Sequence, residues 1–255
     1  MRNAFGHMTS GSWGYPKLAA HRCGGSLAPE NTLAGLDAAM LHGYRMVEFD
    51  AKLSADGQVY LLHDDTLDRT TNGQGAASGM AWAQLAELDA GSRFSAEFAG
   101  ERLPRFDAIA ARCAQLGMAA NIEIKPCPGG ERETGRAVAL AAREMWATGR
   151  TPLLSSFSVD ALAAAHDVAP SLPRGMLFET IPSDWRYIVK ELDCISLHAD
   201  HETLDESFVA ECHAEGLRVL AYTVNDPERA ATLSAWGVDL LCTDRLDLLK
   251  PEHFA

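Results

Sequence analysis

The 255-residue sequence predicts an α/β fold, a (β/α)8 TIM barrel with a small insertion after its second strand. Short apolar runs alternate with helical patterns along the chain, and eight such runs can be counted. The length is one at which a barrel of this kind often forms a single unit. We therefore expect residues 1–255 to form a single TIM-barrel domain. An open doubly wound sheet is the competing fold, but no glycine-rich dinucleotide fingerprint follows the first strand.

The elements follow one another in a regular order, apart from one interruption. The predicted strands cover residues 17–21, 45–54, 118–126, 151–157, 174–180, 194–200, 217–225 and 238–244. The predicted helices cover residues 30–43, 105–117, 131–149, 158–170, 182–193, 202–216 and 226–237. Residues 54–103 contain an Asp-Gly turn and "TTNGQGAASGMAW", and lack the alternation. This segment is the predicted insertion.

The composition limits the classes of partner. The formal net charge of −13 disfavours a nucleic-acid backbone or an anionic membrane surface. We therefore expect no nucleic-acid partner and no stable membrane association. A small anionic substrate remains compatible, because a metal or a few local cations can reverse the field inside one pocket.

The cysteines and the N-terminus predict a cytoplasmic protein. Six scattered cysteines form no C-x-x-C pair, a pattern typical of free thiols in a reducing compartment. Residues 1–21 contain no apolar run long enough for a signal peptide, and no segment approaches the roughly 20 apolar residues of a membrane span.

Polar side chains gather at the ends of the predicted strands, where barrels of this fold place their chemistry. They are His21 and Arg22 at the end of the first strand, Glu48 and Asp50 on the second, Glu123 and Lys125 on the third, His198 and Asp200 at the end of the sixth, and Tyr222, Thr223 and Asn225 at the end of the seventh. Side chains alternate along a strand with a period of two. Glu48 therefore shares a face with Asp50, as Glu123 does with Lys125.

A hairpin is expected to bring His63 to the same place. If Asp56-Gly57 is a two-residue loop, Ala55 opposes Gln58 and Asp50 opposes His63. A three-residue loop would shift this register by one and remove the pairing.

Three carboxylates around one barrel mouth, from Glu48, Asp50 and Glu123, would repel one another unless a cation lies among them. Oxygen ligands favour Mg²⁺, with Ca²⁺ possible as the alternative. Arg22 and Lys125 can bind an anion. With His21 and His63 as acid and base, this set suits phosphoryl chemistry.

Simpler interpretations exist for each group. Glu48 and Asp50 could form salt bridges with Arg45 and Lys52, Glu123 could pair only with Lys125, and His21 could be a structural residue. The co-location of all these groups at consecutive strand ends favours the functional interpretation.

The segment "AHRCGGSLAPENTLAGLDAAMLHGYRMVEFDAKLSADGQVYLLHDDTLDRTTNG" resembles the signature of the glycerophosphodiester phosphodiesterases: His-Arg-Gly, Pro-Glu-Asn-Thr, Glu-x-Asp and His-Asp. "NIEIKP", "AYTVN" and "GVDLLCTD" resemble later motifs, so the similarity covers nearly the whole chain and is closest to the cytoplasmic bacterial form.

The resemblance implies metal-dependent hydrolysis of glycerophosphodiesters to sn-glycerol 3-phosphate and an alcohol. It further implies that the glycerol 2-hydroxyl attacks phosphorus first, giving a cyclic phosphodiester that water opens. It implies metal ligation by Glu48, Asp50 and Glu123, acid–base catalysis by His21 and His63, and phosphate binding by Arg22 and Lys125. Glu30 and Asn31 would support the mouth, and His198 and Tyr222 are further supporting candidates.

Two departures from the family pattern are present. Cys23 replaces the usual Gly after His-Arg, and a left-handed backbone there would cost more with Cys. Tyr222 replaces the usual Trp, which keeps an aromatic wall with a polar tip.

Two other functions remain open. One is phospholipase-like or lyase action on larger phosphodiesters. The other is a non-catalytic barrel that binds a metal-chelated phosphate.

Overall fold

The computed structural model describes residues 13–147 and 149–254. Within these residues, eight parallel strands form the barrel: β1 (Leu18–Ala20), β2 (Met46–Leu53), β4 (Ala119–Ile124), β5 (Leu153–Ser156), β6 (Arg174–Phe178), β7 (Ser196–Asp200), β8 (Arg218–Tyr222) and β9 (Leu240–Thr243). Each pairs with the next, and β1 pairs with both β2 and β9, which closes the sheet. The predicted TIM barrel is confirmed.

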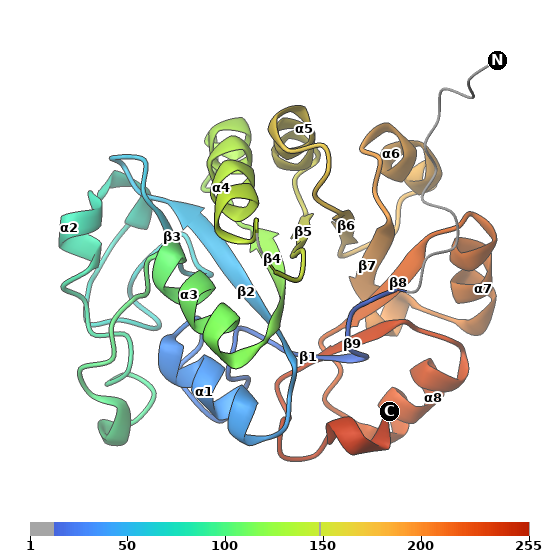
Figure 1. The fold of residues 1–255 in the computed structure, drawn as a ribbon, viewed down its shortest axis with the longest axis horizontal. Coiled ribbons are helices and arrows are strands. Elements are labelled where there is room, and N and C mark those ends of the chain that lie inside the picture. The colour runs from blue at the N-terminus through green and yellow to red at the C-terminus, as the bar shows by residue number, and fades with distance from the viewer. Residues whose placement is uncertain (1–12, 148, 255) are drawn as a thin grey trace.

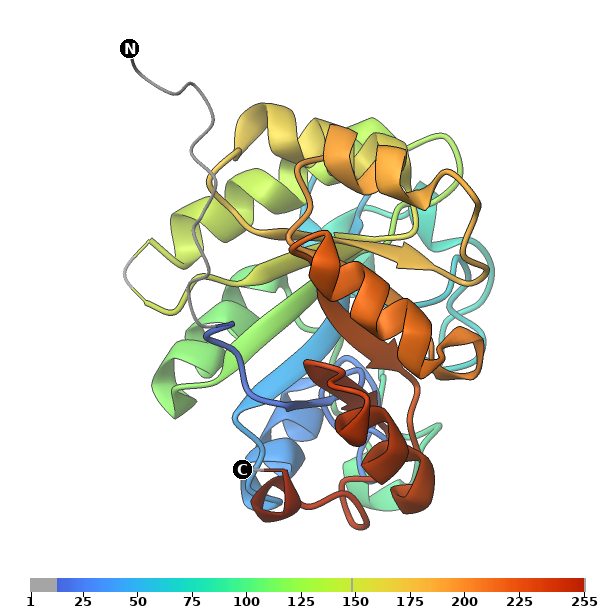
Figure 2. The ribbon, with the colours of Figure 1, turned by 90° about the vertical axis from the view of Figure 1, so that its right-hand side faces the viewer.

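Helices surround the strands (Figures 1 and 2). They are α1 (Leu33–Leu41), α3 (Phe106–Leu116), α4 (Glu131–Met145), α5 (Val159–Val168), α6 (Trp185–Glu191), α7 (Glu206–Ala214) and α8 (Pro227–Ala235). A side-chain oxygen caps the start of several of them: Thr32 accepts from Gly35 N, and Ser158 from Ala161 N. The 3-10 turn Pro251–His253 follows β9.

The segment between β2 and α3 stands beside the barrel, at the left of Figure 1. It contains β3 (Val59–Leu61), which pairs antiparallel with β2, the short helix α2 (Trp82–Leu85), and 3-10 turns at Ala77–Gly79 and Ala96–Phe98. Outside this segment, a further 3-10 turn follows β7 at His201–Thr203. The segment has its own small apolar cluster, which includes Tyr60, Leu67 and Leu85. This separate core explains why the barrel alternation lapses there.

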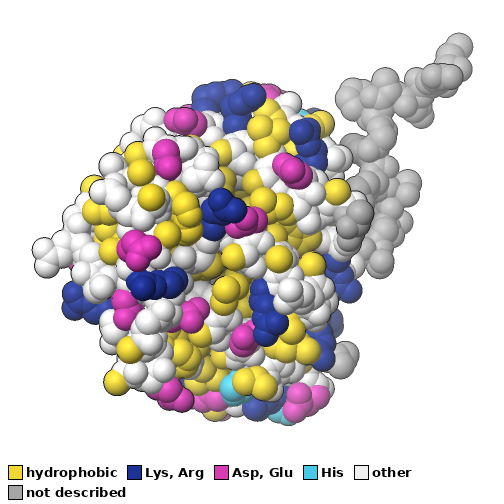
Figure 3. Space-filling model, turned by 60° about the vertical axis from the view of Figure 1, so that its left-hand side comes forward, with side chains coloured by type: hydrophobic (Ala, Val, Ile, Leu, Met, Phe, Trp, Pro, Cys, Tyr) yellow, Lys and Arg dark blue, Asp and Glu magenta, His cyan; other side chains and the backbone are white. Residues whose placement is uncertain are grey.

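On the face shown in Figure 3, basic and acidic side chains are interspersed among uncharged ones. Among the described residues, no helix has the length and apolar character needed to cross a bilayer. The cysteines form no disulfide in the structure. Residues 1–12, which make up most of the segment where a leader was not expected, lie outside the described residues.

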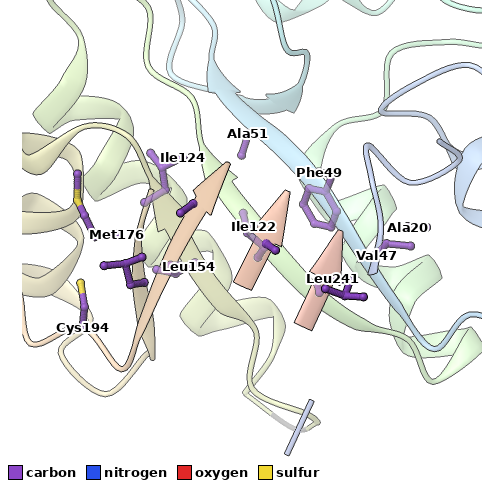
Figure 4. Packing of buried hydrophobic residues seen from close by; sticks show 14 of the residues in the cluster. Ala20, Val47, Phe49, Ala51, Ile122, Ile124, Leu154, Met176, Cys194 and Leu241 are labelled. Carbon is purple, nitrogen blue, oxygen red and sulfur yellow. The ribbon is translucent and has the colours of Figure 1, made fainter. Parts of the chain in front are cut away.

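The barrel strands divide their side chains between two environments. On β2, Val47, Phe49 and Ala51 belong to the large apolar core between sheet and helices (Figure 4), and Phe49 packs edge-on against Phe106 of α3. The alternate residues therefore face the barrel interior. Met46 belongs to the apolar cluster inside the barrel, together with residues of β1, β4, β8 and β9. The same alternation directs Glu48 and Asp50 inward, above Met46.

Candidate active site

The three carboxylates meet where β2 and β4 run side by side. Asp50 pairs in register with Glu123, and Glu48 shares the inward face of β2. One oxygen from each group lies within 4.8 Å of the others, and all three residues are buried. Burial and the neighbouring negative charges raise the pKa of Glu48 to about 8 and that of Glu123 to about 7. A cation among them would favour ionisation of all three.

Asp50 is held by Asn31. The Asn31 amide Nδ2 donates to Asp50 Oδ2 at 2.8 Å, and Asn31 Oδ1 accepts from the Asp50 backbone N–H at 3.0 Å. The backbone of Asn31 is left-handed (φ 57°), a conformation that asparagine tolerates better than most residues. Burial opposes the charge of Asp50, but the nearby His63, Lys125 and Arg22 charges lower its pKa.

His21 follows β1 and is oriented from the other end of the chain. Its Nδ1 lies 2.7 Å from Asp244 Oδ1, just after β9, and its Nε2 lies 4.0 Å from Glu48 Oε2. Burial works against a charged ring, but the Asp244 hydrogen bond and the Glu48 charge raise the pKa of His21. Nε2 is therefore the ring nitrogen directed at the carboxylates.

The predicted hairpin register is wrong by one residue. β2 and β3 pair Ala51 with Leu61 and Leu53 with Val59, so the loop has three residues and Asp50 stands opposite Leu62. Ser54 is the physical cause, because its backbone N–H donates to Gln58 O and its Oγ accepts from Gln58 N. These bonds make Ser54 and Gln58 the closing pair of the hairpin, so that Ala55, Asp56 and Gly57 form the loop.

His63 nevertheless lines the cavity at the barrel mouth. β3 ends at Leu61, so strand parity does not fix the direction of the His63 side chain. Its Nδ1 lies 2.7 Å from Asp64 Oδ1, and Arg69 holds Asp64 through two further bonds. Burial lowers the pKa of His63, and the Asp50 charge offsets this only in part.

Two cations face the carboxylates. Arg22 Nε lies 3.7 Å from Asp50 Oδ2 and has no hydrogen-bond acceptor among the described residues, while Nη1 donates to Glu30 Oε1 at 3.1 Å. Lys125 Nζ donates to Glu123 Oε1 at 2.7 Å and lies 3.9 Å from Asp50 Oδ1. Both cations could bind an anion that enters the cavity.

The alternative salt bridges for Glu48 and Asp50 are not the ones observed. The Lys52 ammonium is fully buried and donates to Asp65 Oδ1 at 2.8 Å. Arg45 donates instead to the Tyr44 carbonyl at 3.2 Å. Lys125 does pair with Glu123, as the simpler interpretation of that pair expected.

The supporting candidates are all near the mouth. Glu30 accepts from Arg69 as well as Arg22, which links the first loop to the inserted segment. His198 and Tyr222 line the cavity. The Tyr222 hydroxyl donates to the Phe178 carbonyl at 2.8 Å. Cys23 is buried, and its backbone is left-handed (φ 71°), which is the conformation that costs more with Cys than with the Gly usual at this position.

Several groups at the mouth were not identified as site residues from sequence. They are Asp64, Asp244, Asn121, Phe157 and Glu179. Asp244 directly follows β9 in "LLCTD", and Asp64 lies three residues after β3 in "HDD", next to His63, which is a signal that could have identified them. Glu179 and Phe157 also follow strands, but nothing in the sequence joins them to the catalytic cluster.

The cavity has a volume of about 500 Å³ and opens at the carboxyl ends of the strands. Active sites of (β/α)8-barrel enzymes lie at this end. The fold and the site together therefore define a barrel enzyme.

Known proteins identify its class. The profile described as the glycerophosphoryl diester phosphodiesterase family matches residues 21–248. A glycerophosphodiester phosphodiesterase of Caldanaerobacter subterraneus subsp. tengcongensis is 31% identical over 232 residues, which are 89% of this chain and 93% of that protein. The chain belongs to this family, and its activity is that of a glycerophosphodiester phosphodiesterase.

Solved structures agree with this assignment. An Oleispira antarctica phosphodiesterase in complex with the product sn-glycerol-3-phosphate is 38% identical, with a TM-score of 0.87 over 90% of this chain and 93% of that one. A glycerophosphodiester phosphodiesterase from Agrobacterium tumefaciens is 28% identical, with a TM-score of 0.77 over 91% of this chain and 98% of that one.

Proposed function

We propose that the chain hydrolyses glycerophosphodiesters to sn-glycerol 3-phosphate and an alcohol in a reaction that depends on a divalent cation, most simply Mg²⁺, with Ca²⁺ as the alternative. The observation that carries the proposal is the buried cluster of Glu48, Asp50 and Glu123, facing two cations and two histidines. The product bound by the similar Oleispira antarctica phosphodiesterase supports the proposed product.

The donor set fits a hard divalent ion. It consists of carboxylate oxygens only. Burial and the neighbouring negative charges raise the pKa of Glu48 and of Glu123, so a bound cation would favour the ionised form of both. Glu48, Asp50 and Glu123 would hold the ion, while Asn31 keeps Asp50 in place. When bound, the ion would neutralise phosphate oxygens and make phosphorus more open to attack.

The protein side chains would share the remaining tasks. Arg22 and Lys125 would bind the phosphate oxygens from the side of Asp50. His21 and His63 have their Nδ1 atoms bonded to carboxylates, which leaves Nε2 of each ring for proton transfer. One ring would take the proton from the attacking hydroxyl, and the other would give a proton to the departing alcohol oxygen.

The proposal extends to the setting of the enzyme. We propose that residues 1–255 act as one catalytic domain in the cytoplasm, with the segment of about 54–103 as an insertion that supplies His63. The unpaired cysteines and the net charge of −13 support this setting. Neither nucleic acid nor a membrane surface is part of the proposal.

The test is release of sn-glycerol 3-phosphate from glycerophosphocholine and glycerophosphoethanolamine, before and after treatment with EDTA. We expect release by the untreated enzyme, its loss after chelation and its return with Mg²⁺ or Ca²⁺. Undiminished release after thorough chelation would refute the metal role. A cyclic phosphate as the end product would support lyase action instead, and tight product binding without turnover would support a non-catalytic barrel.

A further inference from the structure

The cavity continues past the groups proposed to act on phosphate. Its other wall is formed by the ends of β5 to β8, from which Phe157, Glu179, Asp200 and Tyr222 face the opening. A phosphate bound by Arg22 and Lys125 would lie on the β1–β4 side. The opposite wall must then contact another part of the substrate.

This wall carries negative charge without a cation of its own. In the part of the chain that the structure describes, neither Glu179 nor Asp200 has a cationic side chain within ion-pair distance, although both line the cavity. One Asp200 oxygen accepts from the Glu202 backbone N–H at 2.8 Å, which leaves the other oxygen available. By contrast, Glu30, Asp64 and Asp244 all pair with basic side chains.

The same wall is aromatic. The rings of Phe157 and Tyr222 meet edge to face with centroids 5.8 Å apart, and Phe157 is 41% exposed. The Tyr222 ring is fixed by its hydroxyl, which donates to a backbone carbonyl. Lys125 Nζ lies 5.3 Å from the Phe157 ring centroid, so the aromatic pair is adjacent to a side chain that is proposed to bind the phosphate.

Two buried side chains that line the same cavity each have a polar atom without a partner among residues 13–147 and 149–254. These atoms are His198 Nδ1 and Asn121 Oδ1, while the other polar atoms of the two side chains bond Ser196 and Ser155. Gly175 makes room for the imidazole, because a Cβ there would lie 2.2 Å from His198 Nε2. Burial lowers the pKa of His198 to about 3, so the ring is neutral and does not cancel the charge of Glu179 and Asp200. Such unpaired buried groups indicate a site that a ligand or water completes.

We propose that the β5–β8 wall binds the alcohol part of the substrate and selects a cationic alcohol, with Glu179, Asp200 and Tyr222 as its specificity-determining residues. This inference rests on the proposed function. A phosphodiester of choline or ethanolamine carries a negative phosphate and a positive ammonium. The mouth offers cations on one side and carboxylates with an aromatic face on the other, and aromatic faces together with carboxylates favour ammonium groups.

The test compares kcat/KM for glycerophosphocholine with kcat/KM for glycerophosphoglycerol, whose alcohol is neutral. We expect the native enzyme to favour glycerophosphocholine. Glu179→Gln and Asp200→Asn should each lower the choline-to-glycerol ratio by about fivefold. Glu202→Gln is the matched control, because Glu202 is an exposed carboxylate that does not line the cavity, and its ratio should equal the native one.

Asparagine at position 200 keeps an oxygen for the Glu202 N–H, and thermal melts of each variant establish that the fold is intact. Glu179→Lys provides an independent variant, which should favour the neutral diester. An unchanged ratio in the folded variants, or a native enzyme without preference for glycerophosphocholine, would overturn the inference. Failure to hydrolyse either diester would instead contradict the proposed function, so the two failures can be told apart.

Discussion

The two halves of the barrel mouth differ in how their polar groups are held. In the half formed by β1, β2, β4 and the inserted hairpin, most charged groups have a fixed partner, as His21 has Asp244 and Asp50 has Asn31. In the β5–β8 half, Glu179 and His198 Nδ1 have none among the described residues. Bond breaking requires fixed geometry, whereas a wall that contacts the departing alcohol can remain open to it.

The largest effect on activity is expected when a histidine is removed from the half formed by β1, β2, β4 and the inserted hairpin. His21→Ala or His63→Ala should lower kcat by about 10²- to 10⁴-fold, the usual contribution of a general acid or base. The measurement is single-substrate kinetics with glycerophosphocholine, accompanied by a thermal melt. His166→Ala on α5 is a matched control outside the cavity. A folded His21 or His63 variant with near-native kcat would refute the proton-transfer role of that residue.

Removal of the cation should make the stability of the protein depend on the repulsion among the three buried carboxylates. Burial and the charges of Asp50 and Glu123 raise the pKa of Glu48 to about 8 in the metal-free protein, against an ordinary value near 4.5. A raised carboxyl pKa means that the folded state holds a proton that the unfolded state has lost. The stability of EDTA-treated protein should therefore fall as pH rises from about 4.5 to 8.

The variant Glu48→Gln separates this effect from general pH sensitivity. Between pH 5 and pH 8, the melting temperature of EDTA-treated Glu48→Gln should fall less than that of EDTA-treated native protein. It should also gain less from added Mg²⁺ or Ca²⁺. Parallel melting curves for the two proteins across this range would contradict the crowding explanation.

A smaller effect, on the pH dependence of stability, is expected from His198 in the β5–β8 half. Burial lowers the pKa of His198 to about 3 from 6.5. Between pH 6.5 and 3, His198 is therefore protonated in the unfolded state but neutral in the folded state. The stability that is present above pH 6.5 is lost as the pH falls toward 3. The cost is about 2 kcal/mol at pH 5. His198→Gln should reduce the acid-induced loss of unfolding free energy between pH 7.5 and 5, measured by urea titration; an equal loss would count against a buried neutral ring.

The smallest effect concerns Cys23, whose left-handed backbone (φ 71°) favours glycine. Cys23→Gly relieves the backbone conformation and loses a buried side chain, while Cys23→Ala loses the thiol and keeps the conformation. We expect the Gly variant to be more stable than the Ala variant by about 1 kcal/mol. Equal unfolding free energies would show that the left-handed backbone costs little.

The sequence predicted the fold and the cluster because strand periodicity places Glu48, Asp50 and Glu123 on inward faces at one end of the barrel. The hairpin register could not be predicted, because it depends on Ser54 bonding Gln58 rather than on the Asp-Gly pair. The partner of His21 was also missed, since Asp244 is 223 residues away and only barrel closure brings them together. On the β5–β8 wall, His198, Asp200 and Tyr222 were predicted from their places at strand ends, whereas Glu179 was missed because it lies in no local motif.

The most direct test is a crystal structure with Mn²⁺ and sn-glycerol 3-phosphate, using anomalous scattering to locate the ion. We expect one strong anomalous peak with oxygens of Glu48, Asp50 and Glu123 about 2.0–2.6 Å away, and the phosphate between the ion and Arg22 and Lys125. An ion bound elsewhere, or a phosphate that avoids both cations, would contradict the assignment of the catalytic half of the mouth.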